Sequence, residues 1–164
     1  MNKINLNVIL ASYFDKEEYS IDNIFNEIDY SEDGNDIAVV LITNGIYEEG
    51  EQLNFDFFLR KISSEGDNST APKKFLYLFS TEIDKSIPMS EGKKFKENST
   101  KSGYPNWFLA IDGENIHINF PGRGDYELEV FKVIDSEKKE VNERYKEYRK
   151  EKTAPEALYC FKVK

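Results

Sequence analysis

The side chains best suited to catalysis are few in this chain. Its 164 residues include one histidine, His117, and one cysteine, Cys160. A Ser–His or Cys–His pair would have to use His117, which alternates with Ile116 and Ile118 on the outward side of a predicted strand. Cys160 lies between apolar residues, and this setting predicts a buried, unreactive thiol. The sequence therefore predicts no histidine- or cysteine-based catalysis, no Cys/His metal centre and no cofactor.

Carboxylates are the most abundant reactive groups, and they are unevenly distributed. Residues 1–70 hold 15 acidic and 4 basic residues, whereas residues 71–164 hold 16 and 18, within a total charge of −9. An acidic face repels nucleic acid and speeds encounter with a basic protein. We therefore predict a non-enzymatic interaction module with a basic protein partner. The predicted partner-binding residues are acidic positions in two loops: Glu32, Asp33, Asp36, Glu48, Glu49 and Glu51.

Three alternatives remain, and the first uses residues that overlap with the partner-binding set. Oxygen ligands gathered in one glycine-bearing loop are typical of calcium sites, although the spacing does not match an EF-hand; the candidate set is Glu32, Asp33, Asn35 and Asp36. Tyr104 and Trp107 would serve a carbohydrate-type ligand as stacking platforms. An enzyme would need paired carboxylates such as Asp112 and Glu114, which are expected to form a solvated hairpin tip.

Basic residues beside aromatic residues form two clusters, a pattern that can bind single-stranded nucleic acid. The first cluster surrounds Tyr104 and Trp107, and the second surrounds Tyr145 and Tyr148. Acidic residues interleave the second cluster, so Arg144 and its basic neighbours are expected to make surface pairs along a helix. Together with the acidic overall charge, this arrangement argues against nucleic acid as a partner.

Alternating apolar residues predict a mainly β fold. Predicted strands cover 4–14, 19–28, 37–43, 53–62, 75–83, 107–111, 116–120, 126–134 and 157–163. Within them, Asp56 and Glu129 alternate with inward apolar residues and are expected on outward faces. The continuous apolar run at 37–43 favours a central strand, and Asp112-Gly113 predicts a hairpin spanning 107–120. Pro121-Gly122 and Gly124-Asp125 form a tight corner that leads into Tyr126, whose hydroxyl group is expected to bond nearby backbone.

One helix is predicted over 136–152, capped by Asp135 or Ser136. Val141, Tyr145 and Tyr148 share one stripe, so this helix should dock on a sheet. We predict a single domain, 1–164, with an antiparallel β-sandwich core at 4–134. The polar segment 84–103 is long for a loop in a compact domain.

The location of the protein follows from its cysteine content and its hydropathy. A lone cysteine fits a reducing compartment. Residues 4–10 alternate apolar with polar positions and predict a strand in place of a secretion signal. No run approaches the roughly 18 apolar residues of a membrane span. We predict a cytoplasmic protein that is not inserted in a membrane.

Three segments resemble an uncharacterised bacterial β-sandwich family of the immunoglobulin-like or C2-like kind. They are Ala11-Ser12-Tyr13, the stretch 19–25 with Asn23 near its centre, and the Gly124-Asp125-Tyr126 strand. Ser12 stands where the family has an acidic residue, and Asn23 lies near its glycine. The resemblance implies one sandwich domain over about residues 4–134 and carries no catalytic residue.

Overall fold

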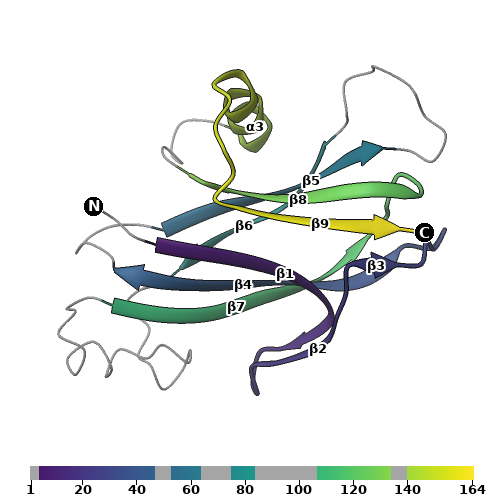
Figure 1. Cartoon of the computed structure of the whole chain (residues 1–164), viewed down its shortest axis with the longest axis horizontal. Helices are drawn as coiled ribbons and strands as arrows, with labels where there is room; N and C mark the ends of the chain where they lie inside the picture. Colours follow the sequence, from purple (N-terminus) through teal and green to yellow (C-terminus); the bar gives the residue numbers. More distant parts are fainter. Residues whose placement is uncertain (1–3, 47–52, 64–74, 84–106, 134–139) are drawn as a thin grey trace. The chain divides into compact units, whose positions relative to one another are not determined.

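The computed structural model describes residues 4–46, 53–63, 75–83, 107–133 and 140–164, whose strands form two sheets (Figure 1). The chain divides into two compact units, each containing one sheet. The first unit comprises residues 1–25, 31–52 and 83–119, and the second comprises 26–30, 53–82 and 120–164. The mainly β class with a C-terminal helix confirms the prediction and is consistent with a β-sandwich. The immunoglobulin-like or C2-like type stays a prediction.

The first unit contains a four-stranded antiparallel sheet in the order β2-β1-β4-β7. Its strands are β1 (Ile4–Asp15), β2 (Ser20–Ile24), β4 (Asn35–Ile46) and β7 (Trp107–Ile118). Residues 37–41 of β4 are all buried, so both faces of this strand are covered. The continuous apolar run therefore marks a central strand, as predicted.

β7 corrects the predicted hairpin, because the strand runs without a break through Asp112 and Gly113. Gly113 lies in register with Val40 of β4, and the ring of Phe14 packs over it. A Cβ atom at Gly113 would lie 2.6 Å from Phe14 Cδ1, closer than such atoms approach. Glycine is required here for close packing of a ring, and not for a turn.

The final part of β1 turns away from β4 and is attached to β7. The register with β4 ends at Ala11, and beyond it the Asn115 side chain bonds the backbone of Phe14. The Phe14 N–H donates to Asn115 Oδ1 at 2.9 Å, and Asn115 Nδ2 donates to the Phe14 carbonyl at 2.8 Å. Phe14 is thereby fixed in a cluster with Ala11, Ala38 and Val40.

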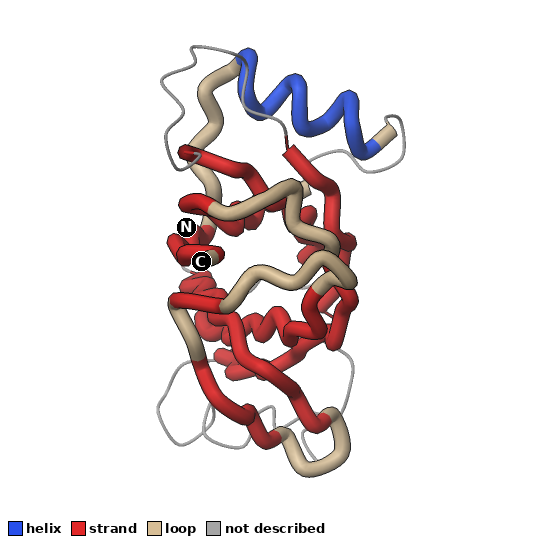
Figure 2. Tube along the Cα trace, turned by 90° about the vertical axis from the view of Figure 1, so that its right-hand side faces the viewer, coloured by secondary structure: helices blue, strands red, loops and turns tan. Residues whose placement is uncertain are grey.

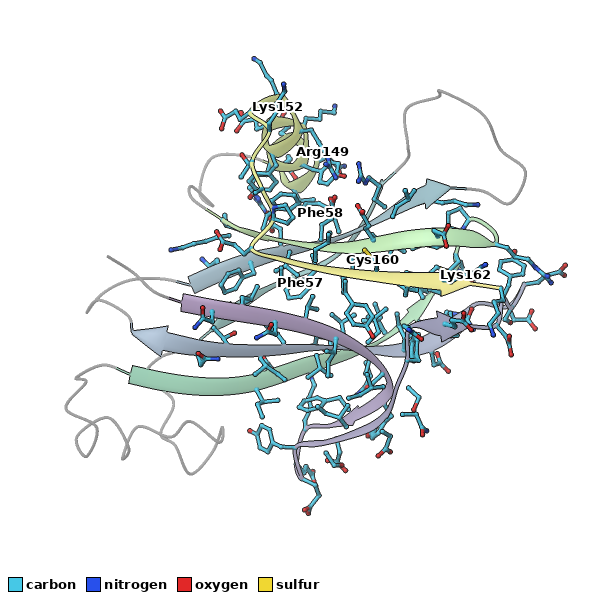
Figure 3. All side chains as sticks on the ribbon, in the orientation of Figure 1. Phe57, Phe58, Arg149, Lys152, Cys160 and Lys162 are labelled. Carbon is cyan, nitrogen blue, oxygen red and sulfur yellow. The ribbon has the colours of Figure 1, made fainter. Side chains whose placement is uncertain are left out.

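The second unit contains a five-stranded mixed sheet in the order β3-β9-β8-β5-β6. Its strands are β3 (Glu27–Ile28), β5 (Leu53–Ser63), β6 (Phe75–Ile83), β8 (Gly124–Lys132) and β9 (Ala157–Val163). β8 pairs antiparallel with β5 and β9, and the short β3 pairs parallel with β9. Phe57 and Phe58 project to opposite faces of β5 (Figure 3), and both are fully buried. Both faces of this sheet are therefore covered along β5.

The corner before β8 forms as predicted. The Tyr126 hydroxyl group donates to the Gly122 carbonyl at 2.5 Å, and Gly122 has φ of +127°, which favours glycine. The Tyr126 ring stacks on Phe161 and meets Phe120 edge to face. Burial, with a smaller contribution from Tyr30, raises the pKa of Tyr126 to about 12, so the hydroxyl group remains a donor at neutral pH.

Helix α3 (Val141–Lys150) docks on the second sheet, as its aromatic stripe predicts. Tyr145 packs on Phe58 and Tyr148 stacks on Phe131, both with ring centroids 4.5 Å apart. Figure 2 shows this helix, in blue, beside the strands and outside the sheet. Such rings contribute about 1.5–3 kcal/mol each when fully buried, which outweighs the poor stability of an isolated short helix.

The helix begins at Val141 rather than at 136, with Glu140 at the N-cap position. The expected caps at 135 and 136, the segment 84–103 and residue 134 lie outside the described residues. α3 has neither the length nor the apolar composition of a membrane-spanning helix, within the described part of the chain.

Candidate functional site

The predicted partner-binding residues are described only in part. Glu32 and Asp33 lie in the loop before β4. Asp36 is the second residue of β4 and pairs with His117 of β7. All three acidic residues are exposed. The other predicted acids, Glu48, Glu49 and Glu51, lie outside the described residues, as does Tyr104. Trp107 begins β7, where its backbone pairs with Ile46.

The acidic loop closes tightly at Gly34. The Gly34 N–H donates to the Ser31 carbonyl at 3.1 Å, and Gly34 has φ of +89°. A Cβ atom at this position would overlap Nε2 of His117 and Oδ1 of Asn119. Both the conformation and the space therefore require glycine, because the loop passes directly over the imidazole ring.

His117 bonds this loop through both ring nitrogens. Nδ1 lies 2.7 Å from Oδ1 of Asp36, its direct partner in the β4–β7 register, and Nε2 lies 2.9 Å from the Asp33 carbonyl. Neither oxygen can donate a hydrogen, so both contacts are hydrogen bonds only when the ring carries two protons. These two bonds, first that to Asp36 and then that to Asp33, raise the pKa of His117.

The result is a fixed loop with free charge at its surface, which we call the clamped acidic loop (residues 31–36). Asp36 uses one carboxylate oxygen for His117 while its side chain remains 87% exposed. Glu32 and Asp33 are exposed, and the clamp uses only the backbone carbonyl of Asp33. Sequence alone gave His117 as a solvent-facing or hydrogen-bonded strand residue, but it did not identify the acidic loop as its partner.

A second set of carboxylates lies beneath α3, where the sequence predicted outward-facing strand residues. Asp56 of β5 is fully buried and accepts two hydrogen bonds from Arg144, from Nε at 2.7 Å and from Nη2 at 2.8 Å. The Tyr148 hydroxyl group donates to the same carboxylate at 3.2 Å. Burial, and then the charge of Asp56, raise the pKa of Tyr148, which keeps this hydroxyl group protonated.

Glu129 of β8 makes a similar arrangement two register positions away, opposite Phe58 of β5. It is 2% exposed, and Arg149 Nη2 and the Tyr145 hydroxyl group both donate to it, the latter at 3.2 Å. Arg60 of β5 lies 3.5 Å from the same carboxylate. Glu129 was predicted to face solvent; it is buried because α3 covers this end of the sheet.

These two carboxylates bind α3 to the sheet by accepting hydrogen bonds from its arginine and tyrosine side chains. Arg144 and Arg149 flank the two buried tyrosines along the helix, and Figure 3 shows Arg149 on α3 above Phe58 of the strand. Arg144 and Arg149 therefore bind the sheet instead of making only surface pairs along the helix. A sequence signal existed in the shared stripe of tyrosine and arginine, but the matching Asp56 and Glu129 lie far away in the chain.

The remaining candidates have local roles. Asp112 Oδ1 accepts from the Gly113 N–H at 2.8 Å, and Glu114 forms an exposed ion pair with Lys16 at 3.0 Å. Cys160 is exposed, which corrects the prediction of a buried thiol. Partial burial and the nearby charge of Glu127 raise its pKa, so the thiolate is disfavoured.

The calcium set is not brought together as a ligand cluster. Within the described ranges, no group of three or more His, Cys, Asp or Glu side chains is placed to hold a metal ion. Comparison of the chain with protein-family models, with curated proteins and with solved structures gave no match. The resemblance to the uncharacterised β-sandwich family stays a prediction.

Proposed function

We propose that this protein is a non-enzymatic protein-binding module whose clamped acidic loop contacts a basic protein partner. The observation that carries the proposal is the pair of hydrogen bonds that His117 makes to the loop, one to the Asp36 side chain and one to the Asp33 carbonyl. A loop that is already held in one conformation loses less entropy when a partner binds. Its exposed carboxylates attract a basic surface and speed encounter.

The contacts of the other reactive groups support a non-enzymatic role. His117 uses both ring nitrogens to hold the loop, which leaves neither of them for proton transfer in this state. Asp56 and Glu129 are bound by arginine and tyrosine side chains of α3. We assign these groups to positioning and stability, and the exposed Glu32 and Asp33 to recognition.

The calcium alternative competes for the same carboxylate. A divalent cation coordinated by Asp36 would share this carboxylate with His117, and a protonated imidazole 2.7 Å from Oδ1 would oppose the cation. Calcium binding would therefore loosen the clamp, whereas a basic protein can contact Glu32 and Asp33 without disturbing it. A calcium titration separates the two functions, because a ligand of the native state raises the melting temperature.

The direct test uses charge reversal at the loop and at a matched position. The full chain is titrated against an array of lysine- and arginine-rich peptides, with acidic peptides as the reference, at about 50 mM and about 300 mM salt. The double variant Glu32→Lys/Asp33→Lys should weaken binding about tenfold or more at low salt, and much less at high salt. The control Glu17→Lys/Glu18→Lys makes the same charge change in the exposed β1–β2 turn and should change binding by less than about twofold.

Two outcomes contradict the proposal. Equal loss in both variants would show that net charge acts without a defined site. Absence of any preference for basic over acidic peptides would remove the acidic loop as a recognition surface. A rise in melting temperature with calcium that Glu32→Lys/Asp33→Lys abolishes would favour the calcium-binding alternative.

A further inference from the structure

β9 has one side that is only partly covered. On its inner side the strand pairs with β8 along its whole length. On its outer side β3 covers only the end of the strand, where the Lys162 N–H donates to the Asn26 carbonyl and the Lys164 N–H donates to the Ile28 carbonyl, both at 2.9 Å. Backbone groups alternate in direction with a period of two residues, so those of Leu158 and Cys160 point to this outer side as well.

Within the part of the chain that the structure describes, residues 157–161 therefore form an open edge. Among the described residues, neither Leu158 nor Cys160 has a backbone partner on this side. Leu158 is 48% exposed, and Cys160, two residues further along the same face of the strand, is exposed as well. Unpaired, aligned N–H and C=O groups are a template for an additional strand.

We propose that a second copy of this chain fills the open edge, with the two β9 strands pairing antiparallel about Tyr159. The open edge is centred on Tyr159, and Leu158 and Cys160 lie one residue to either side. A two-fold axis at Tyr159 places Leu158 of each copy opposite Cys160 of the other. Each such pair exchanges two N–H···O bonds, so the backbone groups that are open in one copy are satisfied by those of the second.

The side chains favour this register. Leu158 of one copy covers Cys160 of the other, which removes apolar surface of both from water. Beyond these residues the edge beside Lys162 is held by Asn26 and Glu27 of the same copy, so the contact between copies ends at residue 161. Figure 3 shows Cys160 along β9, where the contact between copies would form, and Lys162 nearer the end of the strand. The pairing is thus self-complementary in hydrogen bonds and in apolar contact.

The proposal predicts a weak dimer that strengthens with salt. The paired segment is short, so the interface belongs to the small, transient class. Each copy carries a net charge of −9, and repulsion between copies falls as salt screens it. The loop that carries the proposed partner site plays no part in this contact, so either proposal can fail without the other.

A disulfide trap tests the register. In the variant Leu158→Cys, the introduced thiol lies opposite Cys160 of the second copy, at the roughly 5.5 Å Cα separation of a hydrogen-bonded pair, which a disulfide can span. Mild oxidation should give a covalent dimer, read on a non-reducing gel and assigned by peptide mass mapping. Unchanged protein and the control Leu158→Cys/Cys160→Ser should stay monomeric on the same gel, because like positions of the two copies lie too far apart.

Sedimentation velocity tests the edge without any cross-link. Cys160→Pro removes an N–H that points away from β8, so it blocks the open edge and leaves the β8–β9 bonds in place. This variant should weaken dimerisation about tenfold or more, while Cys160→Ser should leave it within about twofold. A melting curve shows whether Cys160→Pro is folded; if it is not, the disulfide trap decides.

The outcomes are distinguishable. A wild-type monomer at all concentrations up to about 0.5 mM overturns the proposal, as does a dimer that Cys160→Pro leaves intact. Failure of Leu158→Cys to cross-link, while sedimentation shows a dimer, overturns the pairing about Tyr159. Binding of an extended peptide to a monomer that never dimerises would assign the open edge to a different protein.

Discussion

The clamped acidic loop of the first unit and the surface beneath α3 in the second both bring carboxylates to cationic side chains, but their exposure differs. Asp36 meets His117 with its side chain 87% exposed, whereas Asp56 meets Arg144 with its side chain fully buried. Water surrounds the first pair and screens it, so its contribution to stability is small. The second pair has no water to replace a lost partner, so each member depends on the other.

Carboxylates serve recognition in the first region and stability in the second. In the acidic loop the clamp uses one oxygen of Asp36 and a backbone carbonyl, and the remaining charge is available to a partner. Beneath α3 the carboxylate oxygens of Asp56 and Glu129 accept bonds from the helix, and their charge is neutralised by arginine. Exposure, and not the number of ionic contacts, therefore determines which carboxylates can attract another molecule.

The largest expected effect follows from removing a buried carboxylate. Asp56→Ala takes the carboxylate away from the mostly buried Arg144 and should lower the free energy of unfolding by about 3–5 kcal/mol. The midpoint of urea unfolding, followed by far-ultraviolet circular dichroism, measures the change. The matched variant Asp36→Ala, at the exposed pair, should move the midpoint by only a small fraction of that amount.

A compensated variant separates the cost of an unpaired buried charge from the value of the ion pair. Replacing both members, as Asp56→Leu/Arg144→Met, removes the buried charges together and should recover most of the stability lost in Asp56→Ala. If Asp36→Ala and Asp56→Ala destabilise the protein equally, the contrast between the two regions is wrong.

The fold was predictable where local pattern determines structure. Continuous apolar residues at 37–41 marked a central strand, and the turn residues before Tyr126 marked the corner, because both depend on neighbours in sequence. The hairpin at Gly113 was wrong for the same reason. Aspartate followed by glycine usually forms a turn, but here the glycine makes room for Phe14, about a hundred residues away in the chain, which no local pattern reveals.

The candidate sites likewise combine features that local sequence predicts with features that depend on tertiary contacts. Acidic residues in a glycine-bearing loop were recognisable as exposed charge, whereas the clamp required knowing that Asp36 and His117 are partners across two strands. Strand alternation predicts that Asp56 and Glu129 lie on an outward face, which is correct for each strand considered without the helix. α3 converts this face to an interior, so their burial is a tertiary property that periodicity cannot supply.

Gly34→Ala should have an intermediate effect, because it strains the clamped acidic loop from within. An alanine at φ of +89° is unfavourable, and its Cβ atom would push against the His117 ring, so we expect a loss of about 1–3 kcal/mol in urea unfolding. In a His117→Ala background the clash with the ring disappears, while the backbone strain and the clash with Asn119 Oδ1 remain. The loss should therefore be clearly smaller in that background; equal losses would show that His117 does not press on the loop.

The smallest expected effect is a pH dependence of the clamp. The pKa of His117 is raised in the folded protein above its unfolded value of about 6.5, so the stabilisation is fully present below that pH. It is lost as the pH rises through the folded pKa, because a neutral ring can donate to only one of its two oxygen partners. The melting temperature of the wild type should exceed that of His117→Gln near pH 5.5–6, by an amount that shrinks toward about pH 9. Since the two proteins share every other titrating group, a difference that stays constant over this range would show that the bonds to Asp33 and Asp36 do not depend on the charge of the ring.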